Sequence, residues 1–338
     1  MSRLKVGVVG LGYWGPNLAR NFNANPEYEL VALCDLDPKR AEKLGASYPW
    51  AKRFSSSAEM LKEAKPDLVA VCTPVASHHP LVKEALEAGA HVLCEKPLAA
   101  SVKEAEELLA LASKNDRKLF VDHTFTYNGA VRMIRDRYEQ GAIGDLFYVD
   151  SVRINLGLFQ PDVDVIWDLA PHDLSIVQYV VAKKIETVQA AGASHNPRGF
   201  ADVAYVDLRF EGGVHAHLHL SWLSPVKIRR MMFSGTKSSI IYDDVEMSEK
   251  VKIYDHGVSF DVKDVEARKQ VLVNYRRGDM HAPAIDNKEA LAVEVTEIAR
   301  ALRGEKADIA SGEDGLATVR VLEAAHASLQ KEGARIAL

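Results

Sequence analysis

The sequence has few cysteines, no long apolar run and little net charge. Its 338 residues include three cysteines without a Cys-X-X-Cys spacing, which excludes a disulfide framework and a cysteine-based zinc site. No apolar stretch approaches the roughly 20 residues that a membrane-spanning helix needs. A formal net charge of -5 gives no general attraction to nucleic acid or to anionic membranes. We therefore expect a cytoplasmic protein with a small-molecule partner, and no nucleic-acid or membrane partner.

The composition is that of an ordinary globular protein. Hydrophobic residues make up 47% of the chain and charged residues 26%, which argues against a disordered, fibrous or membrane class. At this length, domain-size statistics favour two domains. A change of pattern along the chain should mark the boundary between them.

Up to about residue 122, short β-branched runs alternate with amphipathic helical stretches. This alternation is typical of βαβ units around a parallel sheet whose strands are buried on both faces. We predict a Rossmann domain over residues 1–122. Its expected strands are 5–9, 30–34, 52–54, 68–72, 91–94 and 118–121, and its expected helices are 13–23, 38–48, 57–63, 79–87 and 101–113.

After residue 122 the pattern changes to longer strands with period-two alternation. Glu211-Gly212-Gly213 supplies a hairpin turn between two of them. We predict an α+β domain over residues 123–338, in which helices cover one face of an open mixed, largely antiparallel sheet. Its expected strands are 146–155, 187–193, 204–210, 214–221, 229–234 and 239–243, and its expected helices are 130–140, 166–181, 288–303 and 312–330.

One stretch of this second domain has no clear period. Residues 246–279 are polar and charged, and we predict an irregular excursion of strands and loops there. Residues 274–286 contain glycine and proline breaks together with basic side chains. That segment is expected to form either a lid over the substrate pocket or a plain surface loop.

The segment Gly10-Leu11-Gly12-Tyr13-Trp14-Gly15 follows a predicted strand and opens a predicted helix. In this context the glycine pattern is a dinucleotide-binding fingerprint. Gly10 allows the tight turn, Gly12 lets the backbone approach the pyrophosphate, and Gly15 lets the helix pack closely. The helix then directs the positive end of its dipole toward the phosphates.

Asp35 ends the second predicted strand, 20 residues after Gly15. A carboxylate at that position can accept hydrogen bonds from the adenosine ribose hydroxyls, which favours NAD(H). A 2′-phosphate would meet this carboxylate, but Lys39 and Arg40 lie nearby in the sequence and leave NADP(H) open. NAD(H) is therefore the predicted cofactor, and NADP(H) is the alternative.

Two further segments, Thr73-Pro74 and Glu95-Lys96-Pro97, follow the fourth and fifth predicted strands. Ligands of doubly wound sheets bind at the carboxyl ends of the strands, so both segments are expected near the nicotinamide. Lys96 has no obvious packing role there. It is either a solvated loop cation or a functional group.

Asp168 and His172 are four residues apart, so a helix would place both side chains on one face. Pro171 fits only near the first turn of such a helix. The spacing alone suits a capping carboxylate with a buried histidine as well as it suits a catalytic pair.

Taken together, these motifs resemble the glucose-fructose oxidoreductase and inositol dehydrogenase (Gfo/Idh/MocA) family. The resemblance extends over nearly the whole chain, through residues 141–144, 235–236 and 289–302. It implies a Rossmann domain followed by an open mixed sheet, hydride transfer at a sugar or cyclitol carbinol, and homodimers or homotetramers built through the sheet. The motifs that carry it are Gly10 to Gly15, Thr73-Pro74 with His78, Glu95-Lys96-Pro97, and Asp168 with His172.

The resemblance also implies residue roles. His172 would be the general acid/base for the reacting hydroxyl, Lys96 would bond its oxygen, and Asp168 would orient and tune the pair. Oxidation of a secondary alcohol needs a base that titrates near neutrality and a cation beside the developing alkoxide, so no metal is demanded. The implied cofactor-binding residues are Gly10, Gly12, Tyr13, Trp14, Gly15, Asp35, Thr73, Pro74, His78, Glu95 and Lys96.

Three alternating histidines, His215, His217 and His219, project from one face of a predicted strand. Alternate histidines can ligate zinc. Because apolar residues cover the opposite face, we interpret the histidines as marking the open or subunit-contact surface of the sheet, and we predict no metal.

The amino-acid sequences of the glycine loop and of residues 167–173 resemble those of family members that act in nucleotide-sugar or polysaccharide metabolism. We therefore expect oxidation of a pyranose carbon of a nucleotide sugar, such as C3 of a UDP-linked amino sugar, or the reverse reduction. An inositol or free-sugar dehydrogenase and an NAD-dependent glycoside hydrolase remain alternatives. The candidate substrate contacts are His123, Tyr127, Arg153, Asn155, Arg229 and Lys237.

Overall fold

The computed structural model describes residues 2–157, 163–261 and 272–338. The chain divides into two compact units: unit 1 comprises residues 1–127 and 288–323, and unit 2 comprises residues 128–287 and 324–338. The predicted change of fold at residue 122 lies close to the first crossing. Residues 288–323 also belong to unit 1, and this return of the chain was not predicted, because a single boundary was expected.

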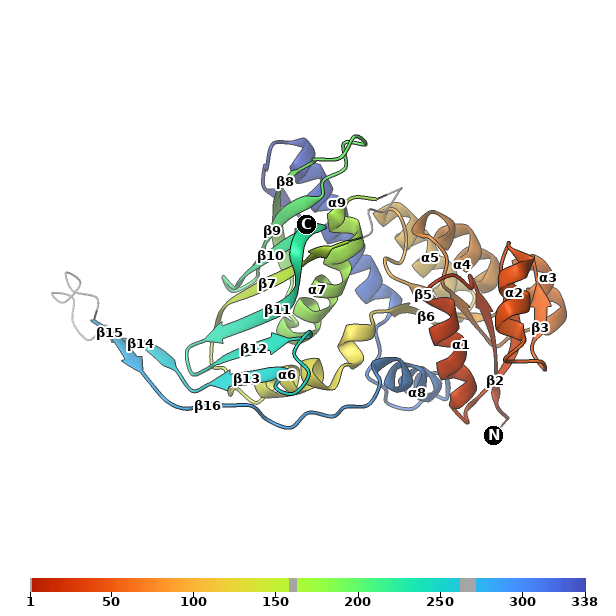
Figure 1. Ribbon diagram of the computed structural model, residues 1–338, viewed down its shortest axis with the longest axis horizontal. Helices are drawn as coiled ribbons and strands as arrows, with labels where there is room; N and C mark the ends of the chain where they lie inside the picture. The colour runs from red at the N-terminus through yellow and green to blue at the C-terminus, as the bar shows by residue number, and fades with distance from the viewer. Residues whose placement is uncertain (1, 158–162, 262–271) are drawn as a thin grey trace. The chain divides into compact units, whose positions relative to one another are not determined.

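Unit 1 is built on a six-stranded sheet with the order β3-β2-β1-β4-β5-β6 (Figure 1). Every neighbouring pair is parallel. Because β1 lies next to both β2 and β4, the strand order reverses at this point, where doubly wound sheets bind their ligands. The strands are β1 (Leu4–Val9), β2 (Tyr28–Cys34), β3 (Lys52–Phe54), β4 (Leu68–Val71), β5 (His91–Glu95) and β6 (Leu119–Asp122).

Helices connect these strands and bury the apolar faces of the sheet. α1 packs on β1 and β2, and α4 packs on β4 and β5. Ser101 caps α5, since its hydroxyl accepts a hydrogen bond from the Glu104 amide at 3.2 Å. The helices are α1 (Gly15–Ala24), α2 (Pro38–Gly45), α3 (Ser57–Ala64), α4 (His78–Glu87) and α5 (Val102–Lys114), with short 3-10 helices at Val75–Ser77 and Thr124–Tyr127.

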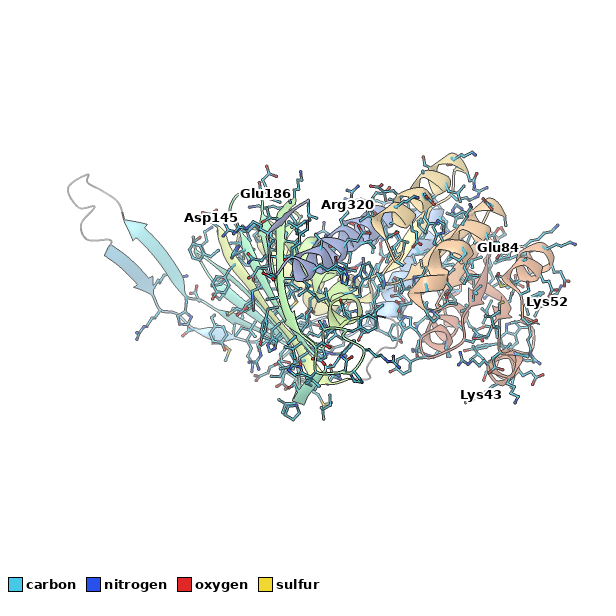
Figure 2. The ribbon with its side chains drawn as sticks, turned by 90° about the horizontal axis from the view of Figure 1, so that it is seen from above. Lys43, Lys52, Glu84, Asp145, Glu186 and Arg320 are labelled. Carbon is cyan, nitrogen blue, oxygen red and sulfur yellow. The ribbon has the colours of Figure 1, made fainter. Side chains whose placement is uncertain are left out.

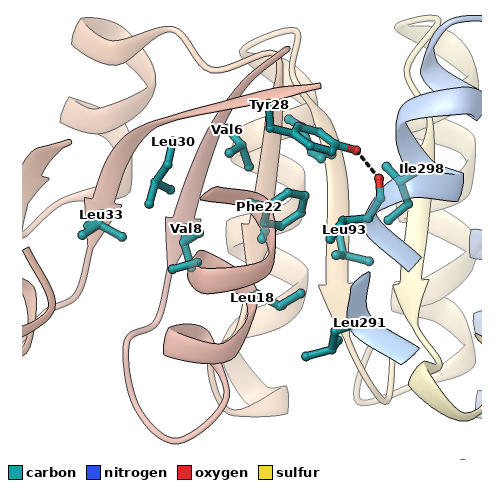
Figure 3. Close-up of a cluster of buried hydrophobic side chains, with 14 of the residues drawn as sticks. Val6, Val8, Leu18, Phe22, Tyr28, Leu30, Leu33, Leu93, Leu291 and Ile298 are labelled. Carbon is teal, nitrogen blue, oxygen red and sulfur yellow. Dashed lines mark hydrogen bonds between the residues drawn. The ribbon is translucent and has the colours of Figure 1, made fainter. Parts of the chain in front are cut away.

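The helix α8 (Ala290–Leu302) also belongs to unit 1, where it packs against α1. Leu291 and Ile298 join the apolar cluster that contains Phe22, and the Tyr28 hydroxyl donates a hydrogen bond to the Val295 carbonyl at 2.8 Å (Figure 3). The prediction that this helix packs on the second sheet was wrong. An amphipathic period shows that one face is buried but not which partner covers it.

The described residues of unit 2 form a nine-stranded mixed sheet and a separate hairpin. β7 and β10 are parallel, and the other neighbouring pairs are antiparallel, which confirms the predicted open mixed sheet. Its order is β16 (Met280–His281), β13 (Val251–Tyr254), β12 (Ser239–Asp243), β11 (Leu223–Gly235), β7 (Leu146–Leu156), β10 (His215–Ser221), β9 (Val203–Phe210), β8 (Ile185–Ala193) and β17 (Ile336–Ala337).

The segment that was expected to be irregular is more regular than predicted. β13 joins β12 and β16 joins β13, while β14 (Gly257–Asp261) and β15 (Leu272–Arg276) form the hairpin. Residues 274–276 end β15 and residues 280–281 form β16, so this segment lies partly in strands, and the lid at 274–286 stays a prediction. Strands of two to five residues carry too short a period to be read from the sequence.

One face of the nine-stranded sheet is covered by α7 (Val165–Val181), which contacts β7, β9 and β10. The helix α6 (Gly129–Glu139) packs against α7, and α9 (Gly312–Gln330) begins in unit 1 and ends in unit 2. Leu218 and Leu220 of β10 point toward the covered face and are fully buried. The alternating histidines lie on the opposite face, as the period-two pattern predicts.

Charged side chains cover the outer surfaces of both units. Lys43 and Lys52 point outward from unit 1, and Asp145 and Glu186 point outward from unit 2 (Figure 2). Among the described residues, no helix is both long and apolar enough to cross a membrane.

Candidate cofactor and substrate sites

The glycine loop between β1 and α1 is shaped by close backbone contacts. Gly10 has a φ of +89°, and a Cβ at this position would lie 2.7 Å from the Cys72 backbone. A Cβ on Gly15 would lie 2.0 Å from the Gly10 carbonyl oxygen. A Cβ on Gly12 would meet only the Arg40 side chain, at 3.6 Å, within the part of the chain that the structure describes. Gly10 and Gly15 therefore make the turn, and Gly12 keeps space open for a ligand.

The N-terminus of α1 lacks the usual capping groups. Trp14 occupies the N-cap position and makes no side-chain capping bond, Pro16 stands in the first turn, and that turn contains no acidic residue. The first amides of a helix seek an acceptor, and the helix dipole favours an anion there. This end of α1 is therefore suited to a phosphate group.

Asp35 anchors the glycine loop to the end of β2. Its carboxylate accepts hydrogen bonds from the Leu11 amide at 2.7 Å and from the Asp37 amide at 2.9 Å, and the side chain is 8% exposed. The Arg40 guanidinium lies 3.8 Å from the same carboxylate and remains half exposed. A carboxylate oxygen has two lone pairs, so Asp35 can still accept a bond from a sugar hydroxyl.

A cavity of about 720 Å³ joins these elements within unit 1. It runs along the carboxyl ends of β1, β2, β4 and β5, where this fold binds a dinucleotide. Its volume is sufficient for such a ligand. The predicted cofactor residues that line it are Gly10, Gly12, Tyr13, Trp14, Asp35, Thr73, Pro74, Glu95 and Lys96.

His78 supports this cavity from behind rather than lining it. Its buried imidazole lies between two carbonyl oxygens, with Nδ1 2.8 Å from the Pro97 oxygen and Nε2 2.7 Å from the Thr73 oxygen. Burial and the charge of Lys96 lower the pKa of His78. The neutral ring can donate to one of these oxygens at a time, and it packs between the two loops that follow β4 and β5.

Buried acidic groups surround the Lys96 end of the cavity. Burial, and secondly the charge of Asp122, raises the pKa of Glu95 to about 8, although Lys96 acts in the opposite direction. Asp122 ends β6 and accepts a hydrogen bond from the Trp14 indole at 2.6 Å, which ties it to the glycine loop. Burial raises the pKa values of Asp122 and of Glu294 on α8.

In unit 2, Asp168 and His172 lie one turn apart on α7, which Asp164 caps through the Ile166 and Trp167 amides at 3.0 Å. Pro171 was expected only near the first turn of this helix, but it lies further inside the helix. The Trp222 indole donates a hydrogen bond to the Asp168 carboxylate at 2.9 Å. Trp222 is 2% exposed, so its ring fixes the direction of that bond.

Beneath α7, Arg153 of β7 forms a buried ion pair with Asp173. The guanidinium lies 2.6 Å from the carboxylate, and the two side chains are 4% and 1% exposed. The Ser151 hydroxyl donates a further bond to Asp173 at 3.0 Å. Arg153 was expected to contact substrate, but the structure gives it a different partner: it holds α7 on the sheet.

Four of the other five expected substrate contacts have partners in their own units. The Tyr127 hydroxyl accepts a bond from the Ala310 amide at 2.8 Å, and His123 is 3% exposed beside Thr318. Both lie in the interior of unit 1, so their prediction as pocket residues has no support here. In unit 2, Arg229 pairs with Asp244 at 3.4 Å, Lys237 donates to the Gly141 carbonyl at 3.1 Å, and Asn155 is half-buried on β7.

The row of histidines on β10 has other partners than a metal. His217 lies 3.1 Å from the Asp207 carboxylate, and the ring of His219 stacks on Tyr205 with their centroids 4.7 Å apart. Over residues 2–157, 163–261 and 272–338, no group of three or more His, Cys, Asp or Glu side chains could hold a metal ion.

Sequence reasoning missed three residues of these sites: Asp122, Trp222 and Glu294. Asp122 carried a signal, because it ends a parallel strand at the edge where ligands bind. Glu294 carried one as well, since it interrupts the apolar period of α8. Trp222 follows β10 and gave no sign of its bond to Asp168, because that contact joins residues 54 positions apart.

Two segments of the chain match a single protein family. Residues 4–123 match an oxidoreductase family with an NAD-binding Rossmann fold, and residues 131–241 match the GFO/IDH/MocA C-terminal domain. These matches confirm the resemblance that the motifs indicated.

Several relatives and solved structures are similar over most of the chain. The uncharacterized oxidoreductase YrbE of Bacillus subtilis (strain 168) is 26% identical over 97% of this chain and 95% of its own. A UDP-N-acetylglucosamine 3-dehydrogenase of Acidithiobacillus ferrooxidans is 26% identical over 96% of each chain. A myo-inositol 2-dehydrogenase of Thermotoga maritima is 24% identical over 75% of this chain and 79% of its own. The WlbA dehydrogenase from Bordetella pertussis, solved with NADH and UDP-GlcNAcA, has a TM-score of 0.82 at 21% identity and covers 100% of this chain and 99% of its own.

Proposed function

The chain belongs to the Gfo/Idh/MocA family of NAD-binding oxidoreductases, and from this premise we propose that it oxidises or forms a secondary alcohol of a nucleotide sugar. The observation that carries the proposal is the cavity of unit 1. At one end it has an anion-binding helix terminus and Asp35, and at the other it has Lys96. A dinucleotide has the length and the charge to join these two ends.

The residues present fit a nicotinamide dinucleotide. The open space at Gly12 and the uncapped α1 amides would hold the pyrophosphate, and Asp35 would accept the adenosine ribose hydroxyls. By exclusion, Glu95 and Lys96 would hold the nicotinamide, which would supply or accept a hydride at the substrate carbon. Glu95 also offers Oε2, a buried oxygen that no donor among the described residues reaches.

We propose NAD(H) as the cofactor in preference to NADP(H). The Asp35 carboxylate would repel a 2′-phosphate, whereas the half-exposed Arg40 would attract one. Because Arg40 already lies against Asp35, its charge is partly neutralised. We expect the dissociation constant for NAD to be below that for NADP, and titration of both nucleotides measures the difference directly.

The chain itself must move a proton and stabilise charge on oxygen. We assign the general acid/base role to His172 and the oxyanion contact to Lys96, as the family resemblance implies. Asp168 orients this machinery, and its bond from Trp222 fixes the carboxylate in one direction. The ion pair of Arg153 with Asp173 then holds α7, and with it both residues, on the sheet.

A UDP-linked sugar is the substrate class that we propose. Support comes from the relative that dehydrogenates UDP-N-acetylglucosamine at C3 and from the solved relative that holds UDP-GlcNAcA. The myo-inositol 2-dehydrogenase relative supports the second candidate, a free cyclitol or sugar. The two candidates differ in the diphosphate, so a UDP-sugar and its free sugar, assayed in parallel, separate them.

We also propose that the chain assembles through the open face of its second sheet. That face presents the row of His215, His217 and His219 with Tyr205, which is 42% exposed. Aromatic side chains gathered on an exposed sheet are typical of protein interfaces. Light scattering of the purified protein gives the subunit number, and a monomer at micromolar concentration would contradict this assembly.

The proposed function is tested by the absorbance of the reduced nicotinamide. The protein is incubated with NAD and, in turn, UDP-N-acetylglucosamine, its uronic acid, the free sugars and myo-inositol. Reduction with a UDP-sugar alone supports the proposal, and reduction with inositol alone supports the second candidate. No reduction in any arm, and no oxidation of NADH by the corresponding keto sugars, would contradict both.

A further inference from the structure

Three carboxyl groups meet in the interior of unit 1, beside the Lys96 end of the cofactor cavity. Glu95 and Asp122 end the neighbouring parallel strands β5 and β6 and are direct register partners. Glu294 comes from α8, on the same buried face as Leu291 and Val295. Asp122 is 1% exposed and Glu294 is 0% exposed. Glutamate is almost never buried this completely without a partner.

The hydrogen bonds of the three groups differ. Asp122 accepts bonds from the Trp14 indole and the Thr124 hydroxyl. Within the described part of the chain, no N–H or O–H group reaches either carboxyl oxygen of Glu294. Burial and the neighbouring Asp122 carboxyl raise the pKa of Glu294. Three carboxyl groups buried together, one of them without a donor for its oxygens, favour a proton inside this carboxyl cluster.

Burial disfavours the charged forms of Cys72, Cys94 and His123, which lie around the cluster. Burial and the neighbouring carboxylates raise the pKa values of the Cys72 and Cys94 thiols. Burial and the charge of Lys96 lower the pKa of His123 to about 4, and the contact of His123 with Asp314 only partly offsets this. The charge at this end of the cavity is therefore set by Lys96 and the three carboxyl groups.

We propose that the carboxyl cluster of Glu95, Asp122 and Glu294 couples binding of the oxidised nicotinamide dinucleotide to release of a proton. The inference rests on the proposed function, which places the nicotinamide at the Lys96 end. The oxidised ring carries a positive charge and the reduced ring does not. Lys96 balances one carboxylate, and a second cation nearby favours ionisation of a second carboxyl, whose proton leaves to the solvent. Binding of the reduced form leaves that proton in place.

Isothermal titration calorimetry of NAD and NADH between pH 6 and pH 9 tests this coupling without turnover. Titrations in phosphate and in Tris, which differ in ionisation enthalpy, give the number of protons released. We expect release of close to one proton with NAD near neutral pH and none with NADH. The dissociation constant for NAD should fall by about threefold to tenfold per pH unit up to pH 8 and then level off, because linkage ends when the cluster is ionised.

The variant Glu294→Gln identifies the cluster as the source of the proton. Glu294 lies behind Asp122 and does not line the cavity, so its replacement changes the charge of the cluster but removes no contact from the cofactor. Removing one carboxyl group lowers the pKa of the other two. The dissociation constant for NAD should therefore stop falling about one pH unit lower than in the parent protein. Asp122→Asn serves as a second variant, since its amide oxygen can still accept the Trp14 bond.

The matched control is Glu297→Gln, three residues after Glu294 on the same helix. Glu297 is 9% exposed, pairs with Arg300 at 3.0 Å and accepts the Asp308 amide at 2.9 Å, outside the carboxyl cluster. It should leave the pH profile of NAD binding unchanged.

The possible outcomes separate the inference from the proposed function. Binding of both nucleotides with dissociation constants that differ less than twofold between pH 6 and pH 9 overturns the coupling alone. An unchanged profile in both cluster variants overturns the assignment to these carboxyls. If neither nucleotide binds, the proposed function fails and the inference fails with it.

Discussion

Replacement of Trp222 by phenylalanine isolates one hydrogen bond at the proposed catalytic helix. The indole N–H donates to the Asp168 carboxylate at 2.9 Å, and the ring is 2% exposed. Phenylalanine keeps an aromatic ring in the same space but has no donor. Asp168 then loses its fixed direction while its charge and its position on α7 remain.

The size of the effect follows from the kind of bond that is lost. A hydrogen bond to a charged group contributes about 1.5–3 kcal/mol, which corresponds to a factor of about ten to one hundred in rate if the bond orients the reacting groups. We therefore expect kcat/KM for the sugar to fall by about that factor. The dissociation constant for NAD should change less than twofold, since every residue that lines the cofactor cavity belongs to unit 1.

Steady-state kinetics and cofactor titration measure the two quantities, and Tyr242→Phe is the matched control. Tyr242 is 1% exposed in the same unit, and its hydroxyl donates to Asp244 at 2.9 Å, so the control also removes one buried donor from an aromatic ring. It should lower the thermal midpoint without lowering kcat/KM. If Trp222→Phe keeps kcat/KM within threefold of the parent, Asp168 does not act through its orientation and the reasoning is refuted.

Three further predictions follow from the contacts described above. Gly15→Ala places a Cβ 2.0 Å from the Gly10 carbonyl oxygen, so the loop must shift and NAD affinity should drop more than about tenfold by titration; unchanged affinity would contradict this role. Arg153→Met leaves Asp173 buried without its cation and should cost about 3–5 kcal/mol in urea unfolding, whereas a loss below about 1 kcal/mol would show that the pair is dispensable. Burial raises the pKa of Glu294 above its value in the unfolded chain, so the folded state is most stable at low pH, where Glu294 is protonated, and loses this stability as the pH rises. The thermal midpoint of the parent should therefore fall relative to that of Glu294→Gln between pH 5 and pH 8. A constant difference between the two thermal midpoints over this range would exclude this effect.

The parallel sheet of unit 1 was predictable because its signals are local. Six apolar runs alternate with amphipathic stretches, and Gly10, Gly12 and Gly15 stand between a strand and a helix. The main strands of unit 2 were predictable for the same reason, since period-two alternation is read within one segment. Most boundaries moved by one or two residues, as at β2 and β7, but β11 begins six residues earlier than predicted, at Leu223.

The placement of α8 and the small strands β13 to β17 could not be predicted in this way. A helix period reveals a buried face, but the partner of α8 is set by the distant Phe22 and Tyr28. β13 pairs with β12 and β16 pairs with β13, so these short strands form where an edge strand offers backbone donors and acceptors, which their own sequence does not record.

The lining of the cavity was predictable where a local motif marks it, since Asp35, Lys96 and the glycine loop do line one cavity, while their roles stay a prediction. The site was not predictable where a side chain acts through a tertiary contact. Arg153 was a candidate substrate contact, yet it pairs with Asp173 beneath α7. Trp222 and Asp122 gain their roles from bonds to Asp168 and Trp14, across 54 and 108 positions.

The most direct test of the account is the reduction of NAD by UDP-N-acetylglucosamine in the parent protein and in Lys96→Ala. The account predicts reduced nicotinamide in the parent. In the variant it predicts a rate at least about a hundredfold lower, with NAD still bound, because the oxyanion contact is gone while the glycine loop and Asp35 remain. Full activity in Lys96→Ala would contradict the proposed chemistry.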